Sequence, residues 1–278
     1  PRAYFTWTPY RDQSFLPNYD SAATDFNLAT IYSDNVFTGN DRISDTRGVT
    51  LGVSSRLLDP GTGAEIVRLG IAQRYLLADQ DVTLPGGTPV QERFSDVLLA
   101  ARVQWTPQWL VDTNFQYNPT IKDSVRTTLL TRYMPGPYRV LSAAYRLQRG
   151  SSEQFDVGWQ WPLSLPWSDT PDRAVPGQAL GPGRWYSVGR INYSVPDRKI
   201  VDLVAGFEYD AGCWIGRVVV ERLTTGTTTA NQRVLFQIEF SGFSRIGSNP
   251  LQTLKDNVPR YQYLREDINP PSRFQQYD

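Results

Sequence analysis

The stretch RVLFQIEFSG, residues Arg233–Gly242, alternates between apolar and polar side chains. The apolar residues share one face and most of the polar ones share the other, as the two-residue period of a β-strand requires. About ten residues is also the length that a tilted strand needs to cross a bilayer. The apolar set is Val234, Phe236, Ile238 and Phe240, and the polar set is Arg233, Gln237, Glu239 and Ser241. The two faces of this strand therefore meet different surroundings.

The same alternation recurs through residues 2–243 in segments of about ten residues. We predict about twelve strands, near residues 2–9, 48–58, 65–77, 94–105, 108–118, 123–133, 138–148, 152–161, 184–194, 200–209, 213–223 and 231–242. A soluble β-sandwich also alternates, but its strands are shorter and its outward face is rich in Lys and Glu. We therefore predict an all-β fold, an antiparallel transmembrane β-barrel segment with a wet lumen. The period places Val97, Val125, Phe155, Val201 and Phe236 toward lipid, and Arg102, Arg126, Gln154, Asp202 and Gln237 toward the lumen.

Composition narrows the function classes. Lys+Arg and Asp+Glu both number 28, so the zero net charge gives no reason to expect a nucleic-acid partner. The chain has no histidine, which excludes Ser-His-Asp catalysis, imidazole bases and the usual zinc sites. An enzyme within a barrel would need a carboxylate dyad, and the surroundings single out no two acidic residues. We expect no catalytic residue, no metal and no cofactor, and no enzyme.

Turn lengths suggest an orientation, because bacterial barrels join strands by short periplasmic turns and longer outer loops. The tight turns near residues 59–63, 106–108, 134–137 and 209–212 fall on one side by strand count, which we take as periplasmic. The long loops 10–47 and 78–93 then face outward. The Pro- and Gly-rich stretch 162–183 is read as a periplasmic insertion, with a missed strand as the alternative. From Ser244 the alternation ends. We therefore divide the chain into barrel residues 1–243 and a C-terminal periplasmic tail, 244–278.

Several blocks of sequence resemble the C-terminal domain of one outer-membrane family. They are PRAYFTWTPYRDQS at 1–14, NVFTGNDRISD at 35–45 and VTLGVSSRLLD at 49–59, followed by LGIAQRYLLAD at 69–79, CWIGRVVVERL at 213–223 and VLFQIEFSGF at 234–243. In this order they resemble LptD, the lipopolysaccharide-assembly family (OstA C-terminal family). The first three blocks are the specific ones, since barrel strands resemble one another.

The resemblance implies a translocon of the outer membrane and a chain that is one piece of a larger barrel. It implies lipopolysaccharide as substrate, an LptE-like lipoprotein plug, and an LptA-like periplasmic bridge that contacts an N-terminal domain outside this chain. Lipopolysaccharide would leave sideways, through a lateral gate where the first and last strands pair weakly. The strand with Val234, Phe236, Ile238 and Phe240 matches the last strand and is one lip of that gate. A general porin or nutrient receptor is the alternative.

The resemblance also singles out Cys213, whose family counterpart belongs to an adjacent cysteine pair that bridges to the N-terminal domain. Position 212 is Gly here, so only one such disulfide can form. A buried free thiol that packs as a small apolar residue is the alternative. Asp41, Arg42 and Asp45 lie in the longest outer loop. They form either a solvated, salt-bridged turn or, as in the family, a loop folded into the lumen.

Five arginines are predicted to face the lumen, where they could attract lipopolysaccharide phosphates. We favour pairing with acidic residues of neighbouring strands instead, since the lumen charges balance. The arginines are Arg102, Arg126, Arg132, Arg146 and Arg190, and the expected partners are Asp96, Asp112, Asp156 and Glu208.

Overall fold

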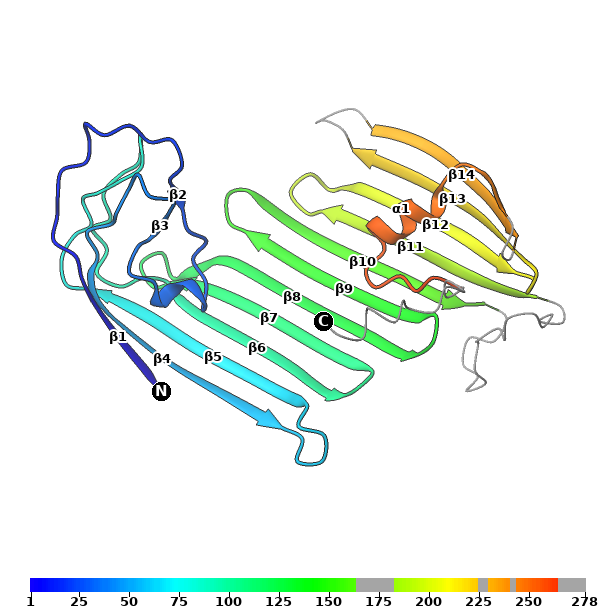
Figure 1. Ribbon diagram of the computed structural model, residues 1–278, viewed down its shortest axis with the longest axis horizontal. Coiled ribbons are helices and arrows are strands. Elements are labelled where there is room, and N and C mark those ends of the chain that lie inside the picture. Colours follow the sequence, from blue (N-terminus) through cyan, green and yellow to red (C-terminus); the bar gives the residue numbers. More distant parts are fainter. Residues whose placement is uncertain (164–182, 225–229, 241–243, 265–278) are drawn as a thin grey trace, which may run out of the picture. The chain divides into compact units, whose positions relative to one another are not determined.

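A computed structural model describes residues 1–163, 183–224, 230–240 and 244–264. Its main feature is one antiparallel sheet of 13 strands, which runs in chain order from β1 through β4 to β15 (Figure 1). The strands are β1 (Arg2–Trp7), β4 (Arg47–Leu58), β5 (Glu65–Leu76), β6 (Val97–Thr106), β7 (Trp109–Asn118), β8 (Asp123–Gly136), β9 (Arg139–Gln148), β10 (Ser152–Pro162), β11 (Arg184–Ser194), β12 (Lys199–Asp210), β13 (Trp214–Thr224), β14 (Ala230–Phe240) and β15 (Ser244–Gly247).

The predicted strands are confirmed, each with bounds within three residues of those expected. β15 is a thirteenth strand that the sequence did not predict. The sheet does not close on itself, because β1 and β15 end its order; this fits a part of a larger barrel. No helix in the described ranges is long and apolar enough to span a membrane.

Turns are short at both ends of the central strands. Residues 107–108 and 137–138 join strands at the end expected to be tight, and residues 119–122, 149–151 and 195–198 do so at the opposite end. The connections before β4 and β6 are long, but the two ends are not distinguished by length alone, since residues 163–183 separate β10 from β11 at the end expected to be tight. Most of the stretch predicted as an insertion, residues 164–182, lies outside the described residues.

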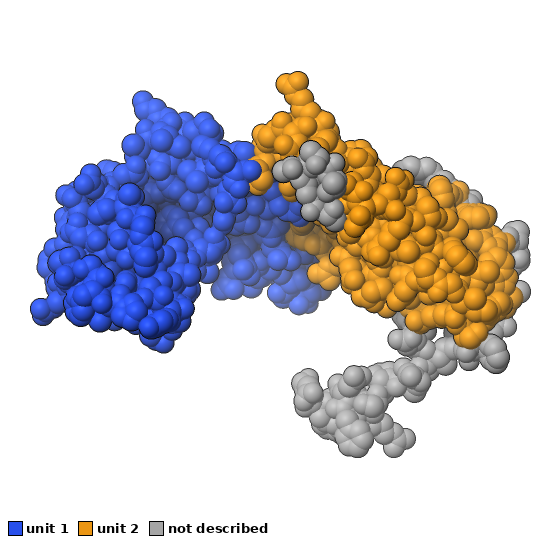
Figure 2. Space-filling view, turned by 90° about the horizontal axis from the view of Figure 1, so that it is seen from above, with its two compact units in different colours: residues 1–106, 111–129, 146–151 blue, residues 107–110, 130–145, 152–278 orange. Residues whose placement is uncertain are grey.

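The chain divides into two compact units (Figure 2). Unit 1 holds residues 1–106, 111–129 and 146–151. In it, the loop after β1 contains a two-stranded pair, β2 (Ala22–Ala23) with β3 (Phe37–Thr38), and the 3-10 helix η1 (Thr30–Tyr32). This loop packs on the face of the sheet predicted to line the lumen, here called the inner face. There Ile31 is fully buried against Ala72 and Leu98.

Two glycines make room for that loop. A Cβ atom on Gly52 of β4 would lie 1.9 Å from the hydroxyl of Tyr32, and one on Gly70 of β5 would lie 3.0 Å from Leu28 Cδ1. Arg74 of β5 donates to the carbonyls of Ile31 and Ser33. The loop is thus held to the inner face by a buried cation as well as by apolar contact.

Unit 2 holds residues 107–110, 130–145 and 152–278. It contains the helix α1 (Pro250–Asn257), which contacts β11, β13 and β14. Asn249 caps this helix by accepting from the Gln252 amide, and Pro250 occupies the first turn, where its missing N–H costs nothing. Residues 249–264, here called the C-terminal strap, cover the inner face of this unit.

Candidate functional site

The four apolar residues expected to line one lip of a gate share one face of β14. Val234, Phe236, Ile238 and Phe240 are 40–64% exposed. The polar side chains of the opposite face, at positions 237 and 239, are buried. β14 therefore separates an apolar outer surface from a polar inner one, as the period of two predicts.

β15 covers one half of the free edge of β14. The two strands pair from Gln237↔Gly247 to Phe240↔Ser244. The ladder does not extend to residues 230–236, which have a strand partner in β13 alone within the described ranges. Sequence reasoning missed β15, because four residues are too few to show an alternation.

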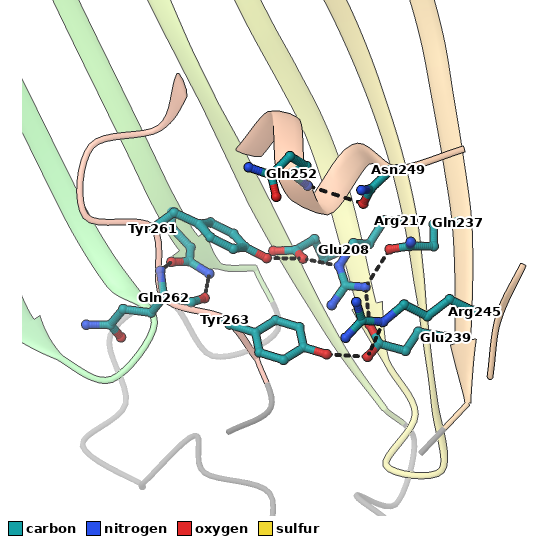
Figure 3. Close-up of polar contacts among 11 residues, drawn as sticks. Glu208, Arg217, Gln237, Glu239, Arg245, Asn249, Gln252, Tyr261, Gln262 and Tyr263 are labelled. Atoms are coloured by element: carbon teal, nitrogen blue, oxygen red, sulfur yellow. Dashed lines mark hydrogen bonds and ion pairs between the residues drawn. The ribbon is translucent and has the colours of Figure 1, made fainter. Parts of the chain in front are cut away.

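A buried arginine joins three strands on the inner face (Figure 3). Arg217 of β13 has no exposed side-chain surface, and it donates to Glu208 of β12 at 2.7 Å and to Glu239 of β14 at 2.6 Å. It also donates to the side-chain oxygen of Gln237 at 3.1 Å. Arg245 of β15 places a second cation 3.2 Å from Glu239. A planar guanidinium with five donors suits such bridging, and the acceptors offset the cost of burying its charge.

Two tyrosines of the C-terminal strap complete this cluster. The hydroxyl of Tyr261 donates to Glu208 at 2.6 Å, and that of Tyr263 donates to Glu239. Burial, reinforced by the charge of Glu208, raises the pKa of Tyr261 well above its ordinary value of 10. The Tyr261 hydroxyl therefore stays protonated and remains a donor at physiological pH.

A reciprocal pair of amides fixes the strap to β10. Gln160 Nε2 donates to the carbonyl of Gln262 at 2.7 Å, and the backbone N–H of Gln262 donates to Gln160 Oε1 at 2.8 Å. Pro259 packs over Gly158, where a Cβ atom would lie 2.8 Å from the proline ring. The absent side chain at Gly158 thus makes room for the strap.

Apolar contacts hold the rest of the strap. Leu254 and Val258, one helical turn apart, pack against Val188, Val204 and Val219 of the inner face. These valines carry the signal that sequence reasoning missed. In β13 the consecutive residues Val218, Val219 and Val220 are apolar at inner as well as outer positions. A strand that is apolar on both faces is covered on both, so this run could have predicted a segment over the inner face.

A family model for LPS transport system D matches residues 1–167, more than half of the chain. The chain belongs to the LptD family. Over all its 278 residues it is 63% identical to the LPS-assembly protein LptD of Polaromonas sp. (strain JS666), of which it covers 34%. It is 37% identical over 271 residues to the LPS-assembly protein LptD of Thiobacillus denitrificans, where 98% of the chain and 35% of the relative are aligned. The chain thus spans about a third of the length of these relatives.

Cys213, the residue expected to form an interdomain disulfide, lies in the turn between β12 and β13. Its side chain is exposed, and its thiol is free. Within this chain the thiol is therefore not packed as a small apolar residue. The turn leaves the thiol open to a partner outside this chain.

The LptD-like loop segment with Asp41, Arg42 and Asp45 is organised by backbone hydrogen bonds. Asp41 accepts from the amides of Tyr19 and Asp20, which lowers its pKa below the ordinary 3.8. Arg42, only 4% exposed, donates to the carbonyl of residue 16 at 2.7 Å. Asp45 accepts from the amides of residues 81 and 82. These hydrogen bonds to the backbone shape the loop.

Three of the predicted inner-face arginines, Arg190, Arg102 and Arg126, lie beside acidic residues. Arg190 donates through Nε to Asp156 at 2.7 Å, and Arg102 lies 4.0 Å from Asp112, both as expected. The partner of Arg126 differs from the prediction, since it lies 2.5 Å from Asp25 in the inserted loop. These cations are neutralised by the protein itself, which favours charge pairing over phosphate binding at these positions.

Proposed function

We propose that this chain forms the C-terminal wall of an outer-membrane translocon that inserts lipopolysaccharide into the outer leaflet. The sugar part would pass the polar lumen while the acyl chains leave through a lateral gate at β14. The observation that supports this most directly is membership of the LptD family, with full-chain relatives named LPS-assembly protein LptD. No catalytic step is part of the proposal.

The aromatic residues of unit 2 support a membrane location. Trp109, Tyr133 and Trp161 form a row at one end of the strands, with ring centroids 4.5 and 6.5 Å apart. Trp185, Tyr209 and Trp214 form a second row at the same end, with ring centroids 4.8 and 5.3 Å apart. All six occupy outward positions of their strands. Such girdles of Trp and Tyr mark the membrane interface of outer-membrane barrels.

The opposite strand end carries outward aromatics as well. Tyr145 of β9 lies 4.8 Å, between ring centroids, from Phe155 of β10, and Tyr193 of β11 is 36% exposed. Between these two levels the outward side chains are apolar and exposed, among them Val157, Leu141, Phe207 and Val218. An apolar band between two aromatic levels fits a bilayer and not a soluble sandwich, whose apolar faces would be buried.

The partners of the whole protein follow from the same proposal. An LptE-like lipoprotein would occupy the remaining lumen, and an LptA-like bridge would deliver lipopolysaccharide through the N-terminal domain. Cys213 would form its disulfide with that domain, which places the β12–β13 turn on the periplasmic side. A general porin or nutrient receptor fits less well, because the C-terminal strap fills the inner face of unit 2.

The lateral gate is tested by closing it in the full-length protein. One cysteine is introduced by Val234→Cys and a second in the first strand of the barrel, and delivery of lipopolysaccharide to the cell surface is measured before and after reduction. We expect the crosslink to block delivery and reduction to restore it. The matched control joins Val220→Cys to Val234→Cys, which face each other across β13 and β14. That crosslink lies within the wall and should leave delivery unchanged. Delivery at the normal rate with the gate crosslinked would falsify the lateral route.

A further inference from the structure

We propose that β15 is a stop that confines the lateral gate to one half of β14, so that the first strand of the whole barrel pairs only with residues 230–235. The inference rests on the lateral gate proposed above and says where along the strand that gate lies. It follows from the backbone groups of β14 and from the way in which the chain leaves this strand.

The backbone groups of β14 alternate in direction. In an antiparallel strand the N–H and C=O of one residue point to the same neighbour, and those of the next residue point to the other. The N–H of Phe236 donates to Ser248 Oγ, and its C=O accepts from that hydroxyl, on the side away from β13. By the same alternation, Ala230, Gln232 and Val234 present their groups on that side. These three residues are the part of the edge that can take another strand.

Residues 247–249 end β15 and lead the chain away from the edge of β14. Gly247 has φ +112°, a conformation that side chains disfavour, and a Cβ atom there would lie 2.4 Å from the carbonyl oxygen of Phe236. Ser248 then satisfies the last backbone groups of the ladder. Asn249 caps α1 directly afterwards. This sequence of residues fixes the length of β15 and turns the chain to the inner face.

Side chains on the inner face hold β15 in place. Arg245 of β15 pairs with Glu239 of β14, and Glu239 also binds Arg217 and Tyr263. For the first strand to pair with positions 237–240, it would have to displace β15 and break this ion-pair cluster. The open half of β14 has no such connection to a further strand within the described ranges. Separating a strand from residues 237–240 would therefore require breaking these ion pairs, whereas separating one from residues 230–235 would not.

The open half lies at the outer-leaflet side. With the Cys213 turn on the periplasmic side, as proposed above, β13 runs outward and β14 runs back toward the periplasm. Residues 230–235 then lie in the outer half of the membrane, and β15 occupies the periplasmic half. A gate of this extent would release acyl chains into the outer leaflet.

The test crosslinks β15 to β14 in the full-length protein. Ile238→Cys and Ile246→Cys replace outward residues that face each other in the ladder. By the alternation described above they form a hydrogen-bonded pair, whose Cα atoms lie about 5.5 Å apart, a distance that a disulfide can span. We expect normal surface delivery of lipopolysaccharide with this bond formed, since β15 never leaves. Loss of delivery that reduction restores would overturn the stop. If the Val234 crosslink to the first strand still blocks delivery, the lateral gate itself survives that result.

A second measurement does not require a new bond between β14 and β15. Single cysteines replace Ala230, Val234, Ile238 or Phe240, each combined with cysteines along the first strand, and disulfide formation is followed by gel mobility. We expect crosslinks from positions 230 and 234 and none from 238 and 240. Crosslinking from Ile238→Cys or Phe240→Cys to the first strand would overturn the proposal, whatever the delivery assay shows.

Discussion

The hydroxyl of Ser248 occupies the ladder position of a strand neighbour for Phe236, accepting from its N–H at 2.8 Å and donating to its C=O at 2.9 Å. A single side chain thereby ends a β-ladder that would otherwise continue along β14. We therefore expect the Ser248 hydroxyl to contribute to the stability of this edge.

Ser248→Ala removes both hydrogen bonds and leaves two backbone groups open on the edge. Each net hydrogen bond contributes about 0.5–1.5 kcal/mol, so we expect about 1–3 kcal/mol lower stability of the full-length protein. The midpoint of urea unfolding in detergent measures this. Ser248→Thr keeps the hydroxyl and should restore most of the stability. Equal losses for both variants would contradict the role of the hydroxyl.

The two strap tyrosines should differ in importance. Among the described residues, Tyr261→Phe leaves fully buried Glu208 with Arg217 as its remaining side-chain partner, whereas Tyr263→Phe leaves Glu239 with two arginines. Removing one partner of a buried charged group costs about 1–3 kcal/mol or more. We expect Tyr261→Phe to lower the unfolding midpoint more than Tyr263→Phe does. The reverse order would show that Glu208 does not depend on Tyr261.

Gly52→Ala should displace the inserted loop, because the new methyl group would lie 1.9 Å from the Tyr32 hydroxyl. Tyr32→Phe removes that oxygen, so the double variant should recover part of the lost stability. Gly70→Ala is the control, since its nearest atom is the end of a flexible leucine at 3.0 Å. Thermal unfolding of the wild type, the two single variants and the double variant gives the coupling energy between positions 52 and 32. If the losses of stability caused by Gly52→Ala and Tyr32→Phe are additive, Tyr32 does not contact β4 at Gly52.

The loop should open in acid. The hydrogen bonds from the Tyr19 and Asp20 amides lower the pKa of Asp41 below 3.8. Because the folded pKa is depressed, the carboxylate stabilises the loop above the ordinary value, and this contribution is lost as pH falls through the folded pKa. Hydrogen exchange at Tyr19 and Asp20, expressed as protection factors, should therefore weaken only below about pH 4. Asp41→Asn should show no such acid step.

Cys213 should be protected from thiol reagents in the full-length oxidised protein and become reactive after reduction. Its exposure in the β12–β13 turn means that the fold of this chain offers no protection of its own. Ala64→Cys, in the exposed turn between β4 and β5, is the control and should react under both conditions. Reaction of Cys213 without reductant would reject the interdomain disulfide.

The two-residue period predicted the strands and their faces, because one face meets an apolar surrounding and the other a polar one. The same reasoning could not find β15, because four residues are too few to show an alternation. Contacts of Glu239 and Ser248 keep this strand in place. The strap was missed for a related reason: Tyr261 and Tyr263 look like residues of a polar tail until β12 and β14 bring Glu208 and Glu239 beside them. Residues 265–278 of the predicted tail lie outside the described residues.

The length of β15 has a consequence for the asymmetry of the membrane. A strand rises by about 3.3 Å per residue, so the position of Gly247 sets how deep in the membrane the lateral gate beside β14 ends. A lipid leaving through that gate would be kept from the inner leaflet by β15, with no separate sorting step. Two residues added to β15 before Gly247 would move the periplasmic end of the gate by about 7 Å toward the outer surface and narrow the exit. The depth to which the exit extends would thus be set by the position of one glycine in the chain.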